Sequence, residues 1–126
     1  MGDTQKSSVL IIDDELSNLR ILTHILKPDY TIYTALNGKT AIEIAKEFQP
    51  SLILLDVIMP NMDGYEVLSA LKESEMTAKI PVIFITGLNS EAHKAKGREL
   101  GVADNISKPF NADTVKAKIS NQLTAS

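Results

Sequence analysis

The segment LILLDVIMPNMDG, residues 52–64, decides the fold of this chain. It begins with four apolar residues, which predict a buried strand, and Asp56 follows them directly. Pro60 and the pair Asp63-Gly64 then mark a turn before the next segment. In a parallel sheet, ligands bind where strands end at their carboxyl side, so an aspartate at this point is a candidate site residue.

Strand-like and helix-like segments alternate along the rest of the chain. Further apolar runs lie at 9–12, 30–33 and 82–85, with a weaker run at 103–106, and we expect all of them to be buried strands. Apolar residues with helical spacing separate these runs and follow the last one. They are Leu19, Leu22 and Leu26; Ala41, Ala45 and Phe48; Val67, Leu68 and Leu71; and Val115, Ile119 and Leu123. The alternation predicts an α/β fold: a doubly wound parallel sheet of five strands, with right-handed crossovers and helices on both faces.

One helix is weakly indicated. In the segment 90–100, Ala92 and Ala95 are the only clear apolar residues before Leu100, so we expect this helix to be marginal or mobile. We find no linker, repeat or attached output module. The chain 1–126 is therefore expected to form one domain with a core from about residue 8 to residue 124.

The composition excludes several classes of function. The chain has 126 residues, 44% of them hydrophobic, which suits one ordinary core. It contains no cysteine, which excludes disulfides, thiolate metal sites and cysteine catalysis. The net charge of -3 and the absence of a basic stripe argue against direct binding of nucleic acid. The apolar runs are too short to cross a membrane, and we expect a cytoplasmic protein.

The side chains that follow the predicted strands should converge on one edge of the sheet. They are Asp13, Asp14 and Glu15 after the first run, Asp56 after the third, Thr86 after the fourth and Lys108 after the fifth. The aspartates would repel one another unless a cation compensated their charge, and carboxylate oxygens favour Mg²⁺. His24 and His93 lack the spacing of metal ligands, and we expect ordinary surface or helix residues at both positions.

A metal, a carboxylate, a hydroxyl and an ammonium group are together what phosphoryl transfer requires. Asp56 is the natural nucleophile, because it ends the most apolar strand and is followed by Val57 and Ile58 rather than by acidic residues. The pair Asp13-Asp14 is better suited to metal binding.

These residues jointly resemble the receiver domains of bacterial response regulators, which act in two-component signalling. The matching elements are Asp13-Asp14, the segment 54–60 with Asp63-Gly64, Thr86-Gly87 and the segment 108–110. The resemblance runs from about residue 9 to residue 123 and so covers nearly the whole chain. It implies the flavodoxin-like, or CheY-like, strand order 2-1-3-4-5.

The resemblance also implies roles for the acidic residues. Asp56 would accept a phosphoryl group from the phosphohistidine of a histidine kinase or a histidine phosphotransfer protein. Asp13, Asp14, Asp56 and the backbone carbonyl of Ile58 would hold Mg²⁺, with Asp14 in direct contact and Asp13 partly through water. Such a domain is a signalling module rather than an enzyme, although it promotes its own phosphorylation and dephosphorylation.

Thr86 and Lys108 would bind the attached phosphoryl group, and the peptide between Lys108 and Pro109 is expected to be cis. In the family, an inward movement of the threonine lets an aromatic residue, three positions before the lysine, turn from exposed to buried. That position is Asn105 here, either an ordinary exposed asparagine or a changed switch.

A second departure concerns the lifetime of the phosphorylated state. In the family, the residues two positions after the aspartate and the threonine flank the water that hydrolyses the acyl phosphate. They are Ile58 and Leu88 here, and neither side chain can hydrogen-bond a water. We therefore expect a long-lived phosphorylated form.

Partner surfaces follow from the same resemblance. Kinase choice should lie on the first helix, 15–26, with Asn18, Arg20 and Thr23 facing a docking helix. The face formed by 90–123 would meet an output domain or effector protein, and many receivers dimerise on their last two helices when phosphorylated. The segment 104–111 resembles receivers attached to cyclic-dinucleotide enzymes.

Other functions fit the sequence less well. A phosphatase of the haloacid dehalogenase type needs a second aspartate two residues after the nucleophile, where Ile58 stands, and also a cap domain. A nucleotide-binding domain would want a Gly-rich first turn, and Asp13-Asp14-Glu15 would repel phosphates. A receiver-like interaction module that works without phosphorylation stays open, with Asn105 as its support. The chain is either a stand-alone regulator or a receiver excised from a hybrid kinase or a multidomain regulator.

Overall fold

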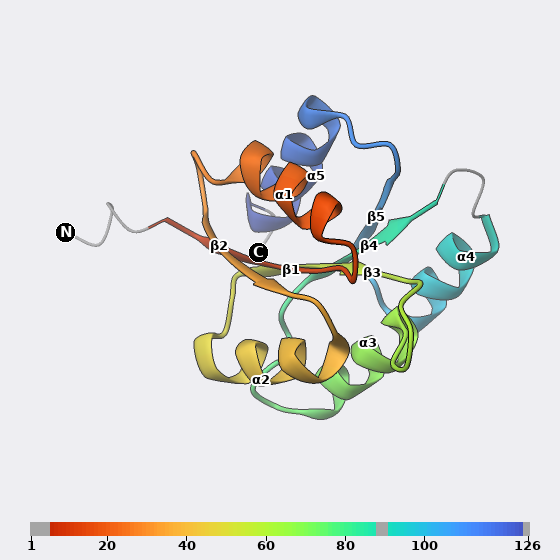
Figure 1. Cartoon of the computed structure of the whole chain (residues 1–126). Helices are drawn as coiled ribbons and strands as arrows, with labels where there is room; N and C mark the ends of the chain where they lie inside the picture. Colours follow the sequence, from red (N-terminus) through yellow and green to blue (C-terminus); the bar gives the residue numbers. More distant parts are fainter. Residues whose placement is uncertain (1–5, 88–90, 125–126) are drawn as a thin grey trace.

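A computed structural model of the chain describes residues 6–87 and 91–124. Strands and helices alternate in it, and the strands form one parallel sheet in the order β2-β1-β3-β4-β5, as predicted (Figure 1). The strands are β1 (Ser8–Ile12), β2 (Thr31–Ala35), β3 (Leu52–Asp56), β4 (Val82–Thr86) and β5 (Asp104–Ser107). The helices are α1 (Leu16–Leu26), α2 (Gly38–Phe48), α3 (Gly64–Glu73), α4 (Glu91–Leu100) and α5 (Ala112–Thr124). Within the described ranges, no helix has the length and apolar character that a membrane span needs.

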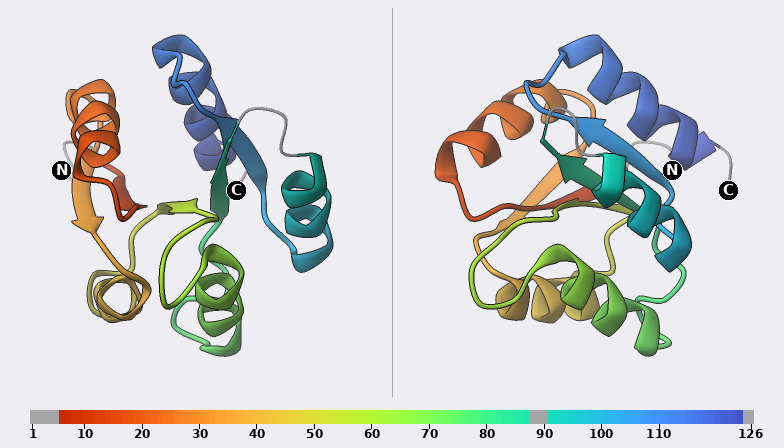
Figure 2. Two further views of the ribbon diagram at one scale, coloured as in Figure 1. Left: turned by 45° about the vertical axis from the view of Figure 1, so that its right-hand side comes forward. Right: turned by 90° about the vertical axis from the view of Figure 1, so that its right-hand side faces the viewer.

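Helices cover both faces of the sheet. Helices α1 and α5 lie on one face, and α2 and α3 lie on the other, with α4 beside α3 (Figure 1, Figure 2). Each face has its own apolar cluster. Leu10, Ile12, Ile53, Leu55 and Phe84 point towards α2 and α3, whereas Val9, Ile11, Leu54, Ile85 and Ile119 pack on the side of α1 and α5. Each fully buried aliphatic side chain contributes about 1.5–3 kcal/mol, so the central strands dominate the stability of the fold.

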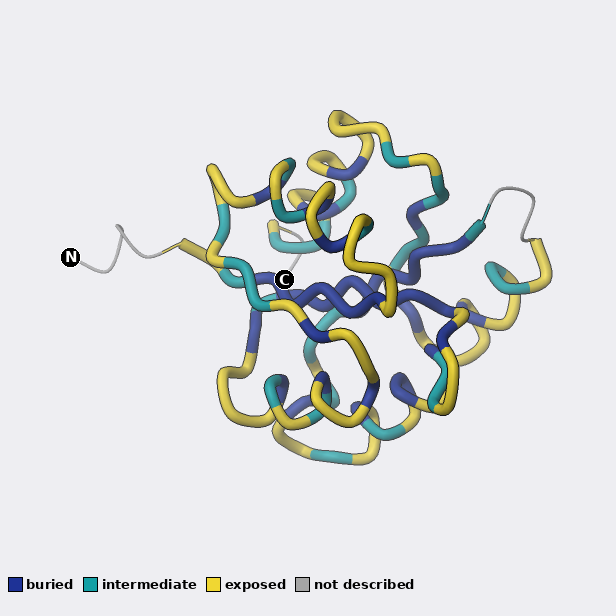
Figure 3. Tube along the Cα trace, viewed as in Figure 1, coloured by how far each residue is buried: buried dark blue, intermediate teal, exposed yellow. Residues whose placement is uncertain are grey.

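The prediction that all five strands are buried is wrong at the two edges of the sheet. Figure 3 shows the three central strands buried apart from Ser8 at the start of β1, whereas β2 exposes Thr31 and Thr34, and only Ile106 is buried in β5. Each of these two strands has a neighbour on one side only. β2 also begins after Tyr30 and continues to Ala35, because its register follows β1 rather than its own apolar run.

The Asp-Gly pair after β3 starts a helix rather than a free turn. Asp63 caps α3: its carboxylate accepts the Glu66 N–H at 2.9 Å, and the Glu66 carboxylate accepts the Asp63 N–H at 3.0 Å. This reciprocal capping satisfies donors that the first helical turn leaves free, and such caps contribute about 1 kcal/mol.

Gly64 is required because α3 begins directly against the end of β3. A Cβ at this position would lie 2.6 Å from the Asp56 carbonyl oxygen and 2.7 Å from the Cα of Val57. The Gly64 N–H also donates to the Val57 carbonyl at 2.8 Å. The close approach fixes the backbone that carries the Asp56 side chain.

Helix α4 forms where a weak helix was expected, from Glu91 to Leu100; Ser90 lies outside the described residues. The sequence indicated Ala92 and Ala95 as the apolar residues of this helix, but both are exposed. The residue that is buried against the sheet is Gly97, which the apolar pattern did not predict. A Cβ on Gly97 would lie 2.7 Å from a ring carbon of Phe84, so the missing side chain lets the helix approach β4. The expected mobility of α4 stays a prediction.

We expect Gly64→Ala to lower the free energy of unfolding by about 2 kcal/mol, because the new methyl group meets backbone atoms that cannot turn aside. Urea denaturation measures the change. Ser69→Ala, an exposed substitution in the same helix, is the matched control and should leave stability nearly unchanged. Equal stability of the two variants would contradict the close packing of α3 on β3.

Candidate functional site

The carboxyl ends of the strands bring the candidate residues together around a cavity of about 350 Å³. Its lining consists of Asp14, Glu15, Asp56, Val57, Ile58, Ile85, Thr86, Gly87, His93 and Lys108. Backbone hydrogen bonds hold its walls beyond the last strand residues, from Val57 N–H to the Ile85 carbonyl at 3.2 Å and from Lys108 N–H to the Thr86 carbonyl at 2.9 Å.

Three carboxylates meet beside this cavity. Asp13, Asp14 and Asp56 each place an oxygen within 4.8 Å of the others. Asp13 is fully buried, and both of its oxygens are occupied, one by the Glu15 N–H at 2.9 Å and one by the Asn18 amide at 3.1 Å. Asp14 is exposed, and no hydrogen bond to its carboxylate occurs among the described residues. Asp14 is therefore the freer of the pair to contact a cation.

Burial and then the neighbouring Asp13 carboxylate raise the pKa of Asp56 from 3.8 to about 7. The Lys108 ammonium and the Ile58 N–H, which donates to Asp56 at 3.3 Å, pull the pKa down without cancelling this rise. The ionised site therefore lacks positive charge. Hard carboxylate oxygens are the ligands that Mg²⁺ prefers, so these residues fit such an ion.

Thr86 and Lys108 supply donors on the other side of Asp56. The Lys108 ammonium lies 3.9 Å from an Asp56 oxygen and 3.9 Å from a Glu15 oxygen. The Thr86 hydroxyl is buried and has no hydrogen-bond partner in the described part of the chain. The peptide between Lys108 and Pro109 is cis, as expected.

His93 is a site residue that sequence reasoning missed. It lies on a helix, α4, which was one of the two expectations, but it is half-buried and lines the cavity with Asp56 and Thr86. The available signal was its spacing of four residues from Gly97, but the packing role of that glycine was not apparent. His24, by contrast, is exposed on α1, as expected.

Asn105 is half-buried rather than exposed. It lies opposite Phe84 in the register of β4 and β5, and its side-chain oxygen is buried without a hydrogen-bond partner in the described ranges. Its backbone carbonyl accepts the Lys118 ammonium at 2.6 Å. The Ile58 side chain is 66% exposed at the cavity rim, and Leu88 lies outside the described residues.

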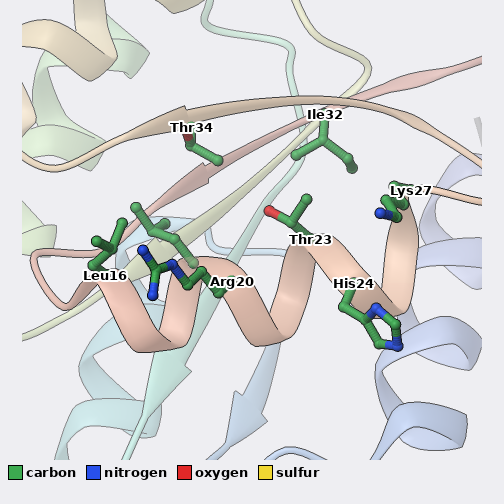
Figure 4. Close-up of a pocket in the computed structure, with 8 residues that line it drawn as sticks. Leu16, Arg20, Thr23, His24, Lys27, Ile32 and Thr34 are labelled. Atoms are coloured by element: carbon green, nitrogen blue, oxygen red, sulfur yellow. The ribbon is translucent and has the colours of Figure 1, made fainter.

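A second cavity, of about 500 Å³, lies between α1 and the edge strand β2 (Figure 4). Arg20 and Thr23 line it, and Figure 4 shows them facing Ile32 and Thr34 of β2. Asn18 instead bonds Asp13. The expectation that Asn18, Arg20 and Thr23 share one docking face is therefore wrong, since residues two and five positions apart lie on different sides of a helix.

Comparison with known proteins agrees with this geometry. A family model described as the response regulator receiver domain matches residues 9–120. The chain belongs to this family. A receiver domain is typically a non-catalytic module of two-component signalling, and receiver domains pair with histidine kinases. The acidic triad of this receiver, Asp13, Asp14 and Asp56, is typical of the family's Mg²⁺ site.

Relatives of this receiver occur in larger proteins. "Histidine kinase P4" of Formosa agariphila is 41% identical over 121 residues, covering 96% of this chain and 9% of that protein. The "Probable cyclic di-GMP phosphodiesterase" of Vibrio cholerae is 37% identical over 123 residues, covering 98% and 28%. The structure of the chemotaxis protein CheY4 of Vibrio cholerae superposes with a TM-score of 0.88 at 28% identity, covering 94% and 99%. The receiver thus spans less than a third of these two curated relatives.

We expect the metal-free protein to lose stability as the pH rises. The pKa of Asp56 is about 7 in the folded state and near 3.8 when unfolded, so the folded protein binds this proton more tightly. The stabilisation that this proton gives the folded state is complete below about pH 4 and is lost as the pH rises through about 7. Above that pH, Asp56→Asn should be more stable than the wild type by on the order of 2 kcal/mol.

Urea unfolding in a chelator, at about pH 5 and about pH 8, measures this difference. Asp29→Asn, which changes an exposed aspartate outside the site, is the matched control and should follow the wild type. If the stability of the wild type and of Asp56→Asn changed with pH in parallel, burial and the Asp13 carboxylate would not raise the pKa of Asp56.

Proposed function

We propose that this receiver accepts a phosphoryl group on Asp56 from the phosphohistidine of a histidine kinase or a histidine phosphotransfer protein. One observation carries the proposal: the buried Asp56 carboxylate faces a cavity that also holds the Lys108 ammonium, 3.9 Å away, and the Thr86 hydroxyl, which has no partner in the part of the chain that the structure describes. An acid, a cation and a free donor around one space are what an incoming phosphoryl group requires.

In this step, an Asp56 oxygen forms a bond to phosphorus as the bond between phosphorus and the donor histidine nitrogen breaks. The electron pair leaves with the imidazole, whose other ring nitrogen carries a proton in the reacting phosphohistidine, so the products are an aspartyl phosphate and a neutral histidine. Asp56 must be ionised to react. Lys108 favours the ionised form because it lowers the pKa of Asp56.

We assign the metal-binding role to Asp13, Asp14, Asp56 and the backbone carbonyl of Ile58. A bound Mg²⁺ would neutralise charge on the carboxylates and on the phosphoryl oxygens. The hydrogen bonds of Asp13 to Glu15 and Asn18 support a positioning role for Asp13, and the exposed Asp14 is suited to direct contact.

After transfer, the Thr86 hydroxyl would donate to one phosphoryl oxygen, and the Lys108 ammonium would pair with another. We propose that the resulting shift of Thr86 reaches the surface 90–123, where an output domain, an effector or a second receiver binds. We also propose that residues 1–126 form one receiver domain with its core at 8–124, consistent with the match to residues 9–120.

Three settings are proposed for this domain: a hybrid kinase, a larger regulator and a stand-alone protein. Its relatives include a histidine kinase and a cyclic di-GMP phosphodiesterase by name, so both a hybrid kinase and a larger regulator fit, as does a stand-alone domain. An interaction module that needs no phosphorylation is the second candidate, and the observation that favours it is Asn105 at the position of the family's aromatic switch.

Incubation with acetyl phosphate and Mg²⁺ should give a phosphoryl adduct on the wild type and none on Asp56→Asn, because only the carboxylate can attack phosphorus. Intact mass detects the adduct, which should be stable in acid and labile in base. Asp29→Asn is the matched control and should be phosphorylated like the wild type. Absence of any adduct would favour the phosphorylation-independent module.

We expect the phosphorylated wild type to persist for minutes or longer, because Ile58 offers no hydrogen bond to an attacking water. Ile58→Asn should hydrolyse faster, since its amide can hold that water. Met76→Asn, another exposed apolar residue but far from the cavity, should keep the wild-type rate. Adduct loss followed by intact mass tests the idea, and loss within seconds in the wild type would refute it.

A further inference from the structure

Two buried polar atoms without partners belong to side chains that line the cavity of Asp56. Among the described residues, the Thr86 hydroxyl and the Nδ1 atom of His93 are buried and make no hydrogen bond. An unpaired buried polar atom costs free energy until a partner arrives. The Thr86 hydroxyl has a proposed partner in the phosphoryl group, whereas His93 has been given none.

The packing of α4 places His93 at the phosphoryl end of this helix. Gly97 contacts Phe84 in the middle of β4, and the Val102 N–H then donates to the Gly97 carbonyl as the chain turns back towards the sheet. Ala103 bonds Val82 at the start of β4. The helix therefore runs opposite to β4, and the residue one turn before Gly97 lies near the end of β4 at Thr86.

An aromatic contact limits where the His93 ring can go. The ring lies 6.2 Å from the Tyr65 ring, centre to centre, and Tyr65 in turn packs edge-on against Phe84 at 5.6 Å. The imidazole is thus held between α3 and the cavity that it lines. A ring fixed in this way loses little further freedom when it binds a ligand.

We propose that His93 is a third phosphoryl-binding residue, which donates a ring N–H to an oxygen of the phosphoryl group on Asp56. This assignment rests on the proposed function of Asp56. The phosphoryl group brings three strong acceptor oxygens with several lone pairs each, so an oxygen that Thr86, Lys108 or Mg²⁺ already contacts can accept one more hydrogen bond. An imidazole carries at least one N–H in either charge state, so it can always donate.

The bond would connect the site directly to α4. This helix is lightly anchored, because Gly97 is its only buried residue in the described range 91–100. A hydrogen bond from His93 to the phosphoryl group draws the first turns of α4 towards the cavity. It supplies a link between site and output surface in a receiver whose aromatic switch position holds Asn105.

The imidazole nitrogens of the wild type report the bond directly. We would record their NMR signals with Mg²⁺, before and after adding beryllofluoride, which mimics the phosphoryl group. We expect the His93 nitrogens to shift and a slowly exchanging ring N–H to appear, while His24, exposed on α1, stays unchanged as an internal control. A purely structural His93 would show no such proton.

Binding of beryllofluoride to variants gives the second measurement. His93→Ala should bind the mimic about tenfold more weakly, the usual effect of losing a hydrogen bond to a charged group. His93→Gln keeps an N–H donor and should recover part of the affinity, whereas His24→Ala should match the wild type. If His93→Ala instead binds as the wild type does, and the His93 signals do not move, His93 is no ligand.

The failure of this inference can be told apart from that of the proposed function. A wild type that binds the mimic, with an Asp56→Asn variant that does not, supports Asp56 whatever His93 does. A wild type that does not bind beryllofluoride at all overturns both proposals.

Discussion

Two buried carboxylates, Asp13 and Asp56, repel each other at the ends of neighbouring strands, and the sheet does not let them separate. Ile12 pairs with Leu55 in the register of β1 and β3, so the next residue of each strand must lie side by side. The apolar residues of both strands are fully buried and provide the stability that offsets this repulsion. Lys108 compensates part of the charge and leaves the rest for a cation. The proposed roles of the site in binding a cation and accepting a phosphoryl group would both draw on a repulsion that the core maintains.

Much of this arrangement could be predicted from the sequence, because strand ends in a parallel sheet are visible as the points where apolar runs stop. Asp56, Thr86 and Lys108 were placed around one cavity on that basis, and the strand order and family followed from the motifs. The errors lie where neighbours decide the outcome. Thr31 and Thr34 are exposed because β2 lies at the edge of the sheet, and the residues of β2 alone do not indicate that position. The position of His93 depends on Gly97 packing against Phe84, a contact between distant segments that no local pattern encodes.

Helices α3 and α4 are anchored to the same layer in different ways. Helix α3 is capped by Asp63 and pressed through Gly64 against the backbone of Asp56. Helix α4 touches the same layer through Gly97, which lies against Phe84, and through His93 and Lys96, which lie beside the Tyr65 ring. Helix α4 is thus held by a few contacts of this kind rather than by interlocking apolar side chains. Asp56 therefore lies between a helix that is anchored on its own backbone and a helix that is anchored through one buried glycine.

The alternation of side chains along β4 separates the two faces of the domain. Ile83 and Ile85 pack on the side of α1 and α5, whereas Phe84 belongs to the opposite cluster, and Thr86 continues the alternation on that side. Thr86 therefore faces the layer of α3 and α4, whereas the isoleucines contact the side of α1 and α5. The strand thus separates two apolar clusters, one on each face of the sheet. A substitution at one position of β4 therefore alters the packing of one helical layer directly and reaches the other layer only through the backbone of the strand.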